Sequence, residues 1–411
     1  MAKIIPFKAV RPSREKVGLV ASRSYEDYPR KELKAQLKFN PFSFLHIINP
    51  GYKYQHEVSG VERFQLVKNR YLEFKEDRTF VQDDTPCFYI YQLTTRAHSF
   101  CGIFAGASVD DYNNNIIKKH EDTIERREVL FKDYLKTVGF NAEPVLLTYP
   151  DNEKIDKIIK KIALNRAEYE FATHDKSVHR FWLIDKQEDI SALQKEFDLI
   201  APLYIADGHH RSASSSLLTK ELREKNKSYT GNEAFNYFLS YLIPESEVRI
   251  SEFNRMVKDL NGLSKEAFLI RLDEFFRIEN RGKELYRPSK KHHFCMYLDG
   301  DFYSLYLRKS LYTFTDALSA LDTQILYKTI LEPILGISDL RNNKRISYGY
   351  GNQNSVKMKD LIDKGTYKVG FGMLPITVEE MKLVANEGLK MPPKSTYIEP
   401  KLRSGLTIYE F

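Results

Sequence analysis

The sequence predicts a protein of the α/β class, with mixed (α+β) character and several lobes. Short apolar runs typical of buried strands alternate along the chain with segments in which apolar residues recur every three or four positions, as in amphipathic helices. The chain has 411 residues, a length that accommodates two or three domains. We expect three regions with boundaries at 1–150, 151–264 and 265–411, the last ending in a strap over the site described below.

The composition indicates an ordered protein that suits small anionic partners. Hydrophobic residues make up 42% of the chain, and tyrosine and phenylalanine number 26 each, a composition unlike that of disordered proteins. The net charge of +7 is a small excess among 63 basic and 56 acidic residues. This excess favours a small anionic metabolite as partner. A nucleic-acid partner is not expected, because no dense basic stripe or helix-turn-helix pattern stands out.

The cysteines and the apolar runs indicate a cytoplasmic protein. Cys87, Cys101 and Cys295 form no close pair, as is usual where thiols stay reduced. The first residues lack the pattern of a signal peptide, and no apolar run approaches the roughly 18 residues that cross a membrane. We therefore expect no membrane association. These features leave the oligomeric state open.

The first region is expected to contain strands and helices in turn. Apolar runs predict strands at 3–10, 42–48, 87–93, 99–109 and 144–149. Helical spacing of apolar residues predicts helices at 29–37, 58–74 and 112–138.

The other two regions follow the same alternation. Between 151 and 264 we expect helices at 151–164 and 190–197, a hairpin of strands 169–173 and 178–184, and a strand at 235–243. Beyond 264 we expect helices at 265–276 and 378–387, a hairpin of strands 294–298 and 302–307, a core helix at 314–335 and a strand at 367–374.

One strand–turn–helix joint in the middle region has the composition of an anion site. The apolar run 203–206 predicts a buried strand, Asp207 and Gly208 end it, and apolar residues at helical spacing predict a helix from His210. Glycine lets the backbone approach a ligand closely, and the first N–H groups of a helix point outward. Arg211 can add a forked, permanently charged donor, and the small Ser212 a hydroxyl.

The same residues have a purely structural interpretation. Asp207 would cap the helix, Gly208 would form the turn, and His209 and His210 would be ordinary surface groups. We favour the functional interpretation because five polar or turn residues with two histidines gather at a single strand–helix joint.

These residues resemble a known family. The stretch Ala206-Asp-Gly-His-His-Arg211 is similar to the hallmark of the bacterial and archaeal DUF1015 family. Further stretches with the same resemblance follow in order along the chain: Ile5 to Ala9, Asn40 to His46, Ile117 to Glu121, Phe253 to Gly262, Met391 to Tyr397 and Glu399 to Gly405.

A shorter resemblance implies a function. Gly208-His-His-Arg211 is similar to the phosphate-binding Gly-x-x-Arg turn of the ParB/sulfiredoxin superfamily, which includes nucleotide hydrolases, sulfiredoxin and a free-serine kinase. The resemblance implies a ParB/sulfiredoxin-like phosphate site and a phosphoryl-transfer enzyme, a kinase or a phosphatase, that acts on a small polar metabolite. Serine and phosphoserine are the most specific candidates. The alternative is a nucleotide-sensing regulatory protein that uses the turn without metabolic chemistry.

The expected roles follow from the chemistry of phosphoryl transfer. The Gly208–Ser212 backbone and Arg211 would hold phosphate oxygens. His210 or His209 would donate a proton to the transferred group or its leaving oxygen. Glu121, or failing that Asp207, would accept the proton of the substrate hydroxyl. We expect ATP or ADP with Mg²⁺ carried by its phosphates, and no metal site built by the protein, since adjacent histidines diverge and no zinc spacing is present.

Two further clusters are candidates for the site, the first with His120 as a catalytic residue beside Glu121. His120 and Glu121 are expected on a helix, where Lys119, His120 and Thr123 share one face. The alternative is a solvated charged helix, because the acidic cluster that follows in the family is missing here. In the irregular C-terminal segment, cations and hydroxyls suited to phosphate or carboxylate are Lys394, Ser395, Thr396, Lys401 and Arg403.

Overall fold

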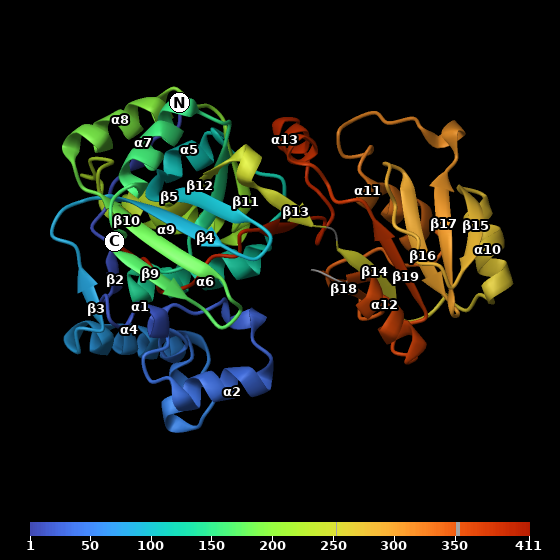
Figure 1. The fold of residues 1–411 in the computed structure, drawn as a ribbon, viewed down its shortest axis with the longest axis horizontal. Coiled ribbons are helices and arrows are strands. Elements are labelled where there is room, and N and C mark those ends of the chain that lie inside the picture. The colour runs from blue at the N-terminus through green and yellow to red at the C-terminus, as the bar shows by residue number, and fades with distance from the viewer. Residues whose placement is uncertain (252, 351–353) are drawn as a thin grey trace. The chain divides into compact units, whose positions relative to one another are not determined.

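The computed structural model describes residues 1–251, 253–350 and 354–411. Contacts divide the chain into two compact units. Unit 1 comprises Met1–Lys119, Thr123–Val248 and Pro400–Phe411, and unit 2 comprises His120–Asp122 and Arg249–Glu399. These bounds differ from the three regions expected from the sequence, because unit 2 is inserted into unit 1. Each unit contains a sheet covered by helices, which confirms the predicted α/β class (Figure 1).

Unit 1 is built on a nine-stranded sheet in the order β6-β11-β8-β12-β5-β4-β10-β9, with β1 beside β5. Strand β11 is parallel to β6, and β12 is parallel to β8, whereas the remaining pairs are antiparallel. The bounds are β1 Ile4–Ile5, β4 Phe88–Thr94, β5 Ser99–Ser108, β6 Ile117–Lys118, β8 Val145–Tyr149, β9 Tyr169–Ala172, β10 Val178–Ile184, β11 Leu203–Asp207 and β12 Tyr237–Pro244. The predicted hairpins of β4 with β5 and of β9 with β10 are confirmed.

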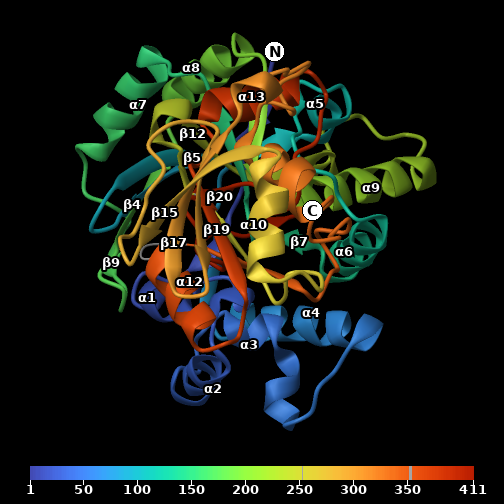
Figure 2. The same cartoon turned by 90° about the vertical axis from the view of Figure 1, so that its right-hand side faces the viewer.

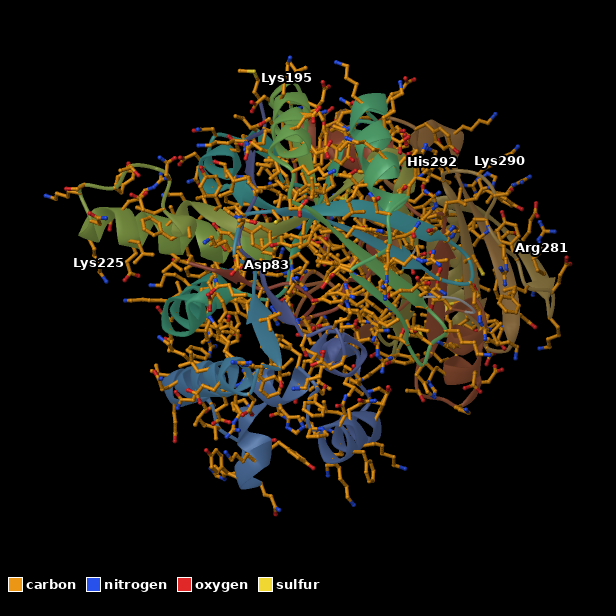
Figure 3. All side chains as sticks on the ribbon, turned by 60° about the vertical axis from the view of Figure 1, so that its left-hand side comes forward. Asp83, Lys195, Lys225, Arg281, Lys290 and His292 are labelled. Carbon is orange, nitrogen blue, oxygen red and sulfur yellow. The ribbon has the colours of Figure 1, made fainter. Side chains whose placement is uncertain are left out.

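Helices cover this sheet through apolar faces. Helices α7 (Glu153–Ala163) and α8 (Gln187–Asp198) lie side by side in Figure 1 and bury Ile155, Ile190 and Leu193 in one core with the strands. Helix α9 (His209–Lys225) packs against β8, β12 and α6 (Glu125–Val138), and Figure 2 shows α6 and α9 as neighbours. Lys225, labelled in Figure 3, marks the end of α9 farthest from the Gly208 turn.

A second apolar cluster of unit 1 joins the N-terminal helices to the C-terminal segment. It takes residues from α1 Val17–Val20, α3 Leu45–Ile48, α4 Gly60–Glu76, β2 Val10–Pro12, β3 Phe80–Gln82 and β7 Phe140–Asn141, together with Ile408. Helix α2 Arg30–Phe39 and strand β21 Tyr409–Glu410 belong to the same unit. The predicted helices at 29–37 and 58–74 are confirmed as α2 and α4. The predicted strand at 42–48 was wrong, because Leu45–Ile48 forms a helical turn. A short apolar run fits either structure when it is buried.

The predicted helix at 112–138 is also interrupted. Helix α5 (Val109–Asn113) ends at Asn113, strand β6 follows, and α6 begins only at Glu125. The interruption falls at Asn113-Asn-Asn115, and Asn115 has a left-handed φ of 58°. Asparagine competes with helical hydrogen bonding through its side chain and tolerates this conformation, so it ends the helix here.

Unit 2 is built on a six-stranded antiparallel sheet in the order β15-β17-β16-β19-β14-β18. The strands are β14 Asn254–Val257, β15 Phe276–Gly282, β16 His293–Leu298, β17 Asp301–Leu307, β18 Ile346–Gly349 and β19 Val369–Met373, with a separate pair of β13 Arg249–Ser251 and β20 Tyr397–Glu399. The helices are α10 Lys265–Asp273, α11 Asp322–Leu326, α12 Asn354–Asp363 and α13 Val378–Asn386. The predicted β16–β17 hairpin is confirmed, with positive φ at Asp299 and Gly300 as a type I′ turn requires.

The long core helix predicted at 314–335 was wrong. The structure has only α11 and one wide helical turn at Tyr327–Leu331, although Ile325, Leu326 and Ile330 are buried as expected. The Oδ1 atom of Asp316 accepts from the backbone of Ser319 at 2.7 Å and forms a turn before α11. Pro333 then prevents a helix from continuing.

Gly405 is a position where the C-terminal segment of unit 1 admits no side chain. Its φ is +76°, and an added Cβ would lie 2.6 Å from the ring of the buried Phe44. Gly405→Ala is therefore expected to destabilise unit 1 by about 2–4 kcal/mol, from backbone strain and overpacking together. Chemical denaturation followed by the fluorescence of Trp182, which lies in strand β10 of unit 1, measures the change.

The matched control is Gly231→Ala. Gly231 also lies in unit 1 and has a φ of +86°, but an added Cβ would meet no atom within 4 Å. It is expected to lose only about 1–2 kcal/mol from the left-handed backbone. If both variants lose the same free energy of unfolding, the contact with Phe44 does not contribute to the destabilisation.

Candidate functional site

The strand–turn–helix joint expected at Gly208 is present in unit 1. Strand β11 ends at Asp207, and helix α9 begins at His209, one residue earlier than predicted. Gly208 has a φ of 102° and a ψ of 29°, a left-handed conformation that favours glycine. An added Cβ would lie 3.1 Å from Nε of Arg211. Glycine therefore satisfies the backbone of the turn and leaves room for the arginine.

Arg211 lies across this turn and links two strands of the sheet. Its Nη2 donates to Oδ2 of Asp207 at 2.7 Å, and its Nη1 donates to the carbonyl oxygen of Pro144, just before β8. The side chain is 33% exposed. Since a guanidinium has five N–H donors, Arg211 can hold Asp207 and still present donors to a ligand.

Lys401 of the C-terminal segment brings a second cation to the turn. Its Nζ lies 3.3 Å from Oδ1 of Asp207. Burial acts to raise the pKa of Asp207, but the charges of Lys401 and Arg211 outweigh it and hold the pKa below the usual value. Asp207 is therefore ionised at neutral pH, and two cations share one carboxylate.

Asp27 is a further carboxyl near this group, which the sequence analysis missed. Burial raises the pKa of Asp27, the charge of Lys401 opposes the rise, and Asp207 adds to it. Paired backbone hydrogen bonds of 3.2 and 2.8 Å between Ser22 and Ser404 hold the two segments together. No spacing in the sequence signals this proximity, because it depends on a pairing between the two ends of the chain.

The histidines and serines of the turn differ in accessibility. His209 is buried, whereas His210 is half-buried. The hydroxyl of the buried Ser212 donates to the carbonyl of His209 at 3.0 Å, and Ser214 and Ser215 donate to carbonyls one turn earlier in the helix. Hydroxyls bonded in this way face their own helix. The structure thus makes His210 the more accessible histidine and engages Ser212 within the helix.

The model of one known protein family matches most of this chain. The model described as "Protein of unknown function (DUF1015)" matches residues 4–324. The chain belongs to the DUF1015 family. Among curated proteins no match was found.

Solved structures similar to this DUF1015 protein resemble it only distantly. A free serine kinase in complex with AMP has 13% sequence identity and a TM-score of 0.33, over 74% of this chain and 91% of the other. The protein SbnI from Staphylococcus aureus, with a C-terminal truncation, has 14% identity and a TM-score of 0.36, over 74% and 85%. A conserved hypothetical protein from Pyrococcus furiosus has 15% identity and a TM-score of 0.32, over 73% and 91%.

The His120–Glu121 pair of this DUF1015 protein does not lie on a helix. It follows β6 directly, and together with Asp122 it belongs to unit 2. His120 is fully buried, its carbonyl oxygen accepts from the N–H of Met391 at 2.8 Å, and Glu121 is half-buried. The helical face expected for Lys119, His120 and Thr123 was therefore wrong, because the asparagine run ends the helix before them.

The cluster at Lys394, Ser395 and Thr396 also belongs to unit 2. Lys394 is exposed, has a left-handed φ of 58°, and places its ammonium 5.8 Å from the ring centre of Phe253. Ser395 is buried, and its hydroxyl donates to the carbonyl of Pro392 at 2.6 Å, while Thr396 is half-buried. Lys394 thus presents its charge to solvent, and Ser395 holds the irregular backbone.

Arg403 lies in unit 1 and binds the β9–β10 hairpin. It donates to Oδ2 of Asp175 at 2.9 Å and to the hydroxyl of Thr173 at 3.1 Å, and its side chain is 11% exposed. Burial and the charge of Arg403 together lower the pKa of the neighbouring His179 to about 4. Both C-terminal cations Lys401 and Arg403 lie in unit 1, where Lys401 contacts the Gly208 turn and Arg403 has a carboxylate partner in the hairpin.

Neither a metal-binding cluster nor a membrane-spanning helix is present among the described residues. Across residues 1–251, 253–350 and 354–411, no group of three or more histidine, cysteine, aspartate or glutamate side chains has the arrangement of a metal site. Within the same ranges, every helix is too short or too polar to cross a bilayer.

Proposed function

We propose that this DUF1015 protein binds a phosphorylated ligand at the Gly208 turn and transfers or removes a phosphoryl group on a small polar metabolite. The observation that carries the proposal is the convergence of Arg211 and Lys401 on Asp207, at a glycine turn that opens the 17-residue helix α9. The guanidinium of Arg211 has five N–H donors, so an anion at the turn can accept from those that do not bind Asp207. The N-terminus of the helix adds a dipole that favours an anion.

The electrostatics suit the transition state of phosphoryl transfer. Its negative charge is spread over the equatorial phosphate oxygens, and positioned donors stabilise it more than they stabilise the substrate. Arg211 offers a planar fork that matches two such oxygens, and Lys401 a mobile point charge. Gly208 has no side chain, which lets the backbone approach the phosphate closely. A bound nucleotide, ATP or ADP with Mg²⁺ on its phosphates, would supply or accept the phosphoryl group.

Proton transfer has candidates at the same turn. His210 is half-buried and follows the turn directly, so it is our candidate for the donor to the leaving oxygen. Asp207 is ionised and could accept a proton from a substrate hydroxyl. Asp27 is a second candidate for this role, because its raised pKa makes it the stronger base. The roles predicted from the sequence for Glu121, Lys394 and Ser395, which belong to unit 2, remain proposals.

The direct test combines ligand stabilisation with a transfer assay. The melting temperature is measured with phosphate, ATP, ADP, CTP and phosphoserine, because a ligand that binds only the folded protein raises it. At least one phosphorylated ligand is expected to do so. The assay then follows phosphate release and transfer between each nucleotide and serine or phosphoserine, the most specific pair that the turn's resemblance implies.

The outcomes separate the two candidate functions. Transfer or release supports the enzyme. Nucleotide stabilisation without turnover on any small hydroxylated metabolite would favour the nucleotide-sensing regulatory protein. A melting temperature that no phosphorylated ligand changes would contradict the proposed phosphate site. Arg211 would then serve only as the structural partner of Asp207.

A further inference from the structure

A pocket lined by residues outside the Gly208 turn lies in the N-terminal helical part of unit 1. It has a volume of about 300 Å³ and is lined by Pro41, His46, Asn49, Pro50, Tyr52, Lys53, Arg70 and Phe74. This is the lower end of the range of small-molecule sites, roughly 300–1,000 Å³. Pro41 and His46 come from the stretch 40–46, which resembles the DUF1015 family and has no role in the proposed function.

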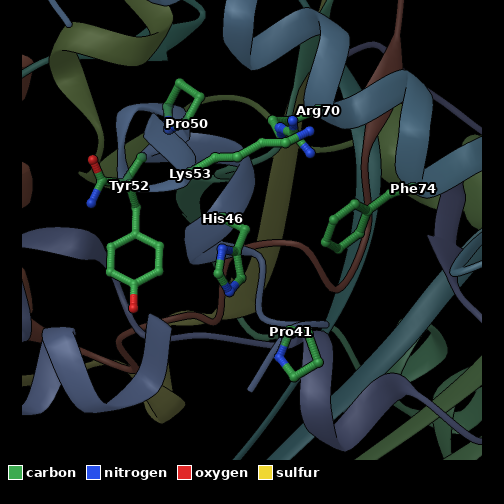
Figure 4. Close-up of a pocket in the computed structure, with 8 residues that line it drawn as sticks. Pro41, His46, Pro50, Tyr52, Lys53, Arg70 and Phe74 are labelled. Carbon is green, nitrogen blue, oxygen red and sulfur yellow. The ribbon is translucent and has the colours of Figure 1, made fainter. Parts of the chain in front are cut away.

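Part of the pocket lining is apolar. The ring of Phe74 is buried, as is Pro50, and the exposed Pro41 also lines the pocket. Figure 4 shows the rings of Phe74, Pro41 and Tyr52 around the central imidazole of His46. Apolar rings of this kind bind the carbon body of a small molecule and exclude water from it.

Two cations line the same pocket. Figure 4 shows the Lys53 side chain running toward Arg70. Arg70 pairs with Glu73 and is 15% exposed, whereas Lys53 is exposed and has no ion-pair partner among the described residues. Two like charges in one concave site repel each other, and a single carboxylate does not balance them. An anion between them would relieve this repulsion.

His46 is held in a defined orientation at the centre. Its Nε2–H donates to the carbonyl oxygen of Asn40 at 3.1 Å, and Tyr52 packs against the ring at 5.7 Å in an edge-on geometry. Burial lowers the pKa of His46, and the charge of Arg70 lowers it further. The imidazole is therefore neutral at pH 7. With the proton on Nε2, Nδ1 can accept a hydrogen bond.

We infer that this pocket binds a small organic anion, with its carboxylate or phosphate between Lys53 and Arg70 and its apolar body against Phe74 and Pro50. Arginine binds either group through two parallel hydrogen bonds, and Lys53 adds a second positive charge. This is a second ligand site, and it does not depend on phosphoryl transfer at the Gly208 turn.

The test uses benzoate and phenyl phosphate as probes on the full chain carrying Arg211→Ala, so that the Gly208 turn does not contribute. Saturation-transfer NMR and calorimetric titration measure binding. At least one of the two anions is expected to bind, and which binds more tightly distinguishes a carboxylate from a phosphate site. Benzyl alcohol, which has the same ring without the charge, is expected to bind at least about tenfold more weakly.

Substitutions assign the binding to the pocket. Lys53→Gln and Arg70→Gln are each expected to weaken the anion about tenfold. Lys53 is exposed, so its variant will fold even if the Arg70 variant does not. Lys68→Gln is the control, since Lys68 lies on the same helix as Arg70 and does not line the pocket. Failure of both anions to bind, equal binding of benzyl alcohol, or unchanged affinity in Lys53→Gln would overturn the proposal.

Discussion

Arg211→Lys is expected to fold normally and to bind phosphate-bearing ligands at least about tenfold more weakly than the wild type. Lysine keeps the positive charge and can still pair with Asp207, so unit 1 retains its ion pair. It cannot supply the planar fork that engages two phosphate oxygens at once. A tenfold loss corresponds to about 1.4 kcal/mol of binding free energy. Arg211→Ala should lose about a hundredfold. Calorimetric titration with the nucleotide that stabilises the wild type measures both.

Arg223→Lys is the matched control for this prediction. Arg223 lies on the same helix α9, and its two Nη atoms donate to the carboxylate of Asp110 at 2.7 and 2.9 Å. Arg223 and Asp110 also form a forked ion pair, but Arg223 lies near the C-terminal end of the helix, far from the Gly208 turn. Its variant should keep full affinity. If Arg211→Lys keeps full affinity too, and Arg211→Ala only lowers the melting temperature, Arg211 serves Asp207 and not a ligand.

Glu121→Gln is expected to reduce turnover by roughly 10²- to 10⁴-fold and to leave nucleotide affinity within about twofold, if Glu121 is the base that we propose. Glutamine has the same shape but cannot accept the proton of a substrate hydroxyl. The structure removes the competing view of Glu121 as part of a solvated helix, because residues 120–122 lie outside any helix and His120 is fully buried. Initial rates at saturating nucleotide, together with a separate titration of nucleotide binding, test the prediction.

Glu125→Gln serves as the control for Glu121. Glu125 is exposed at the first position of helix α6, four residues further along the chain. Its variant should turn over at the wild-type rate. Normal turnover in Glu121→Gln would exclude Glu121 as the base and direct attention to Asp27 or Asp207.

The sequence predicted well where one local signal dominates. The Asp-Gly joint, the β4–β5 and β16–β17 hairpins and the α/β class follow from periodicity and turn chemistry that act within a few residues. It failed where an apolar run fits two structures, as at 42–48 and 314–335. In a buried segment every residue can be apolar, so helical and strand periodicity cannot be distinguished. A proline or a turn formed by a polar side chain then determines where a helix ends.

The candidate site shows the same limit. The residues of the turn are neighbours in sequence, so their chemistry could be inferred from composition alone. Lys401 could be named as a cation, but its contact with Asp207 joins residues that are 194 positions apart in the sequence. Asp27 was missed for the same reason. Contacts between the two ends of a chain leave no periodic signal in a single sequence.

The discontinuity of unit 1 has a consequence for the order of synthesis. Its last segment, Pro400–Phe411, follows roughly 150 residues of unit 2 and carries Lys401, Gly405 and Ile408 into contacts with earlier parts of unit 1. At typical rates of about 5–20 residues per second, a ribosome takes about 8–30 s to translate that insertion. During this time the nascent unit 1 lacks its closing segment. Asp207 lacks one of its two cations, and the apolar groups under residues 405–408 face solvent. A chain that stalls within the insertion would expose this surface to chaperones and proteases.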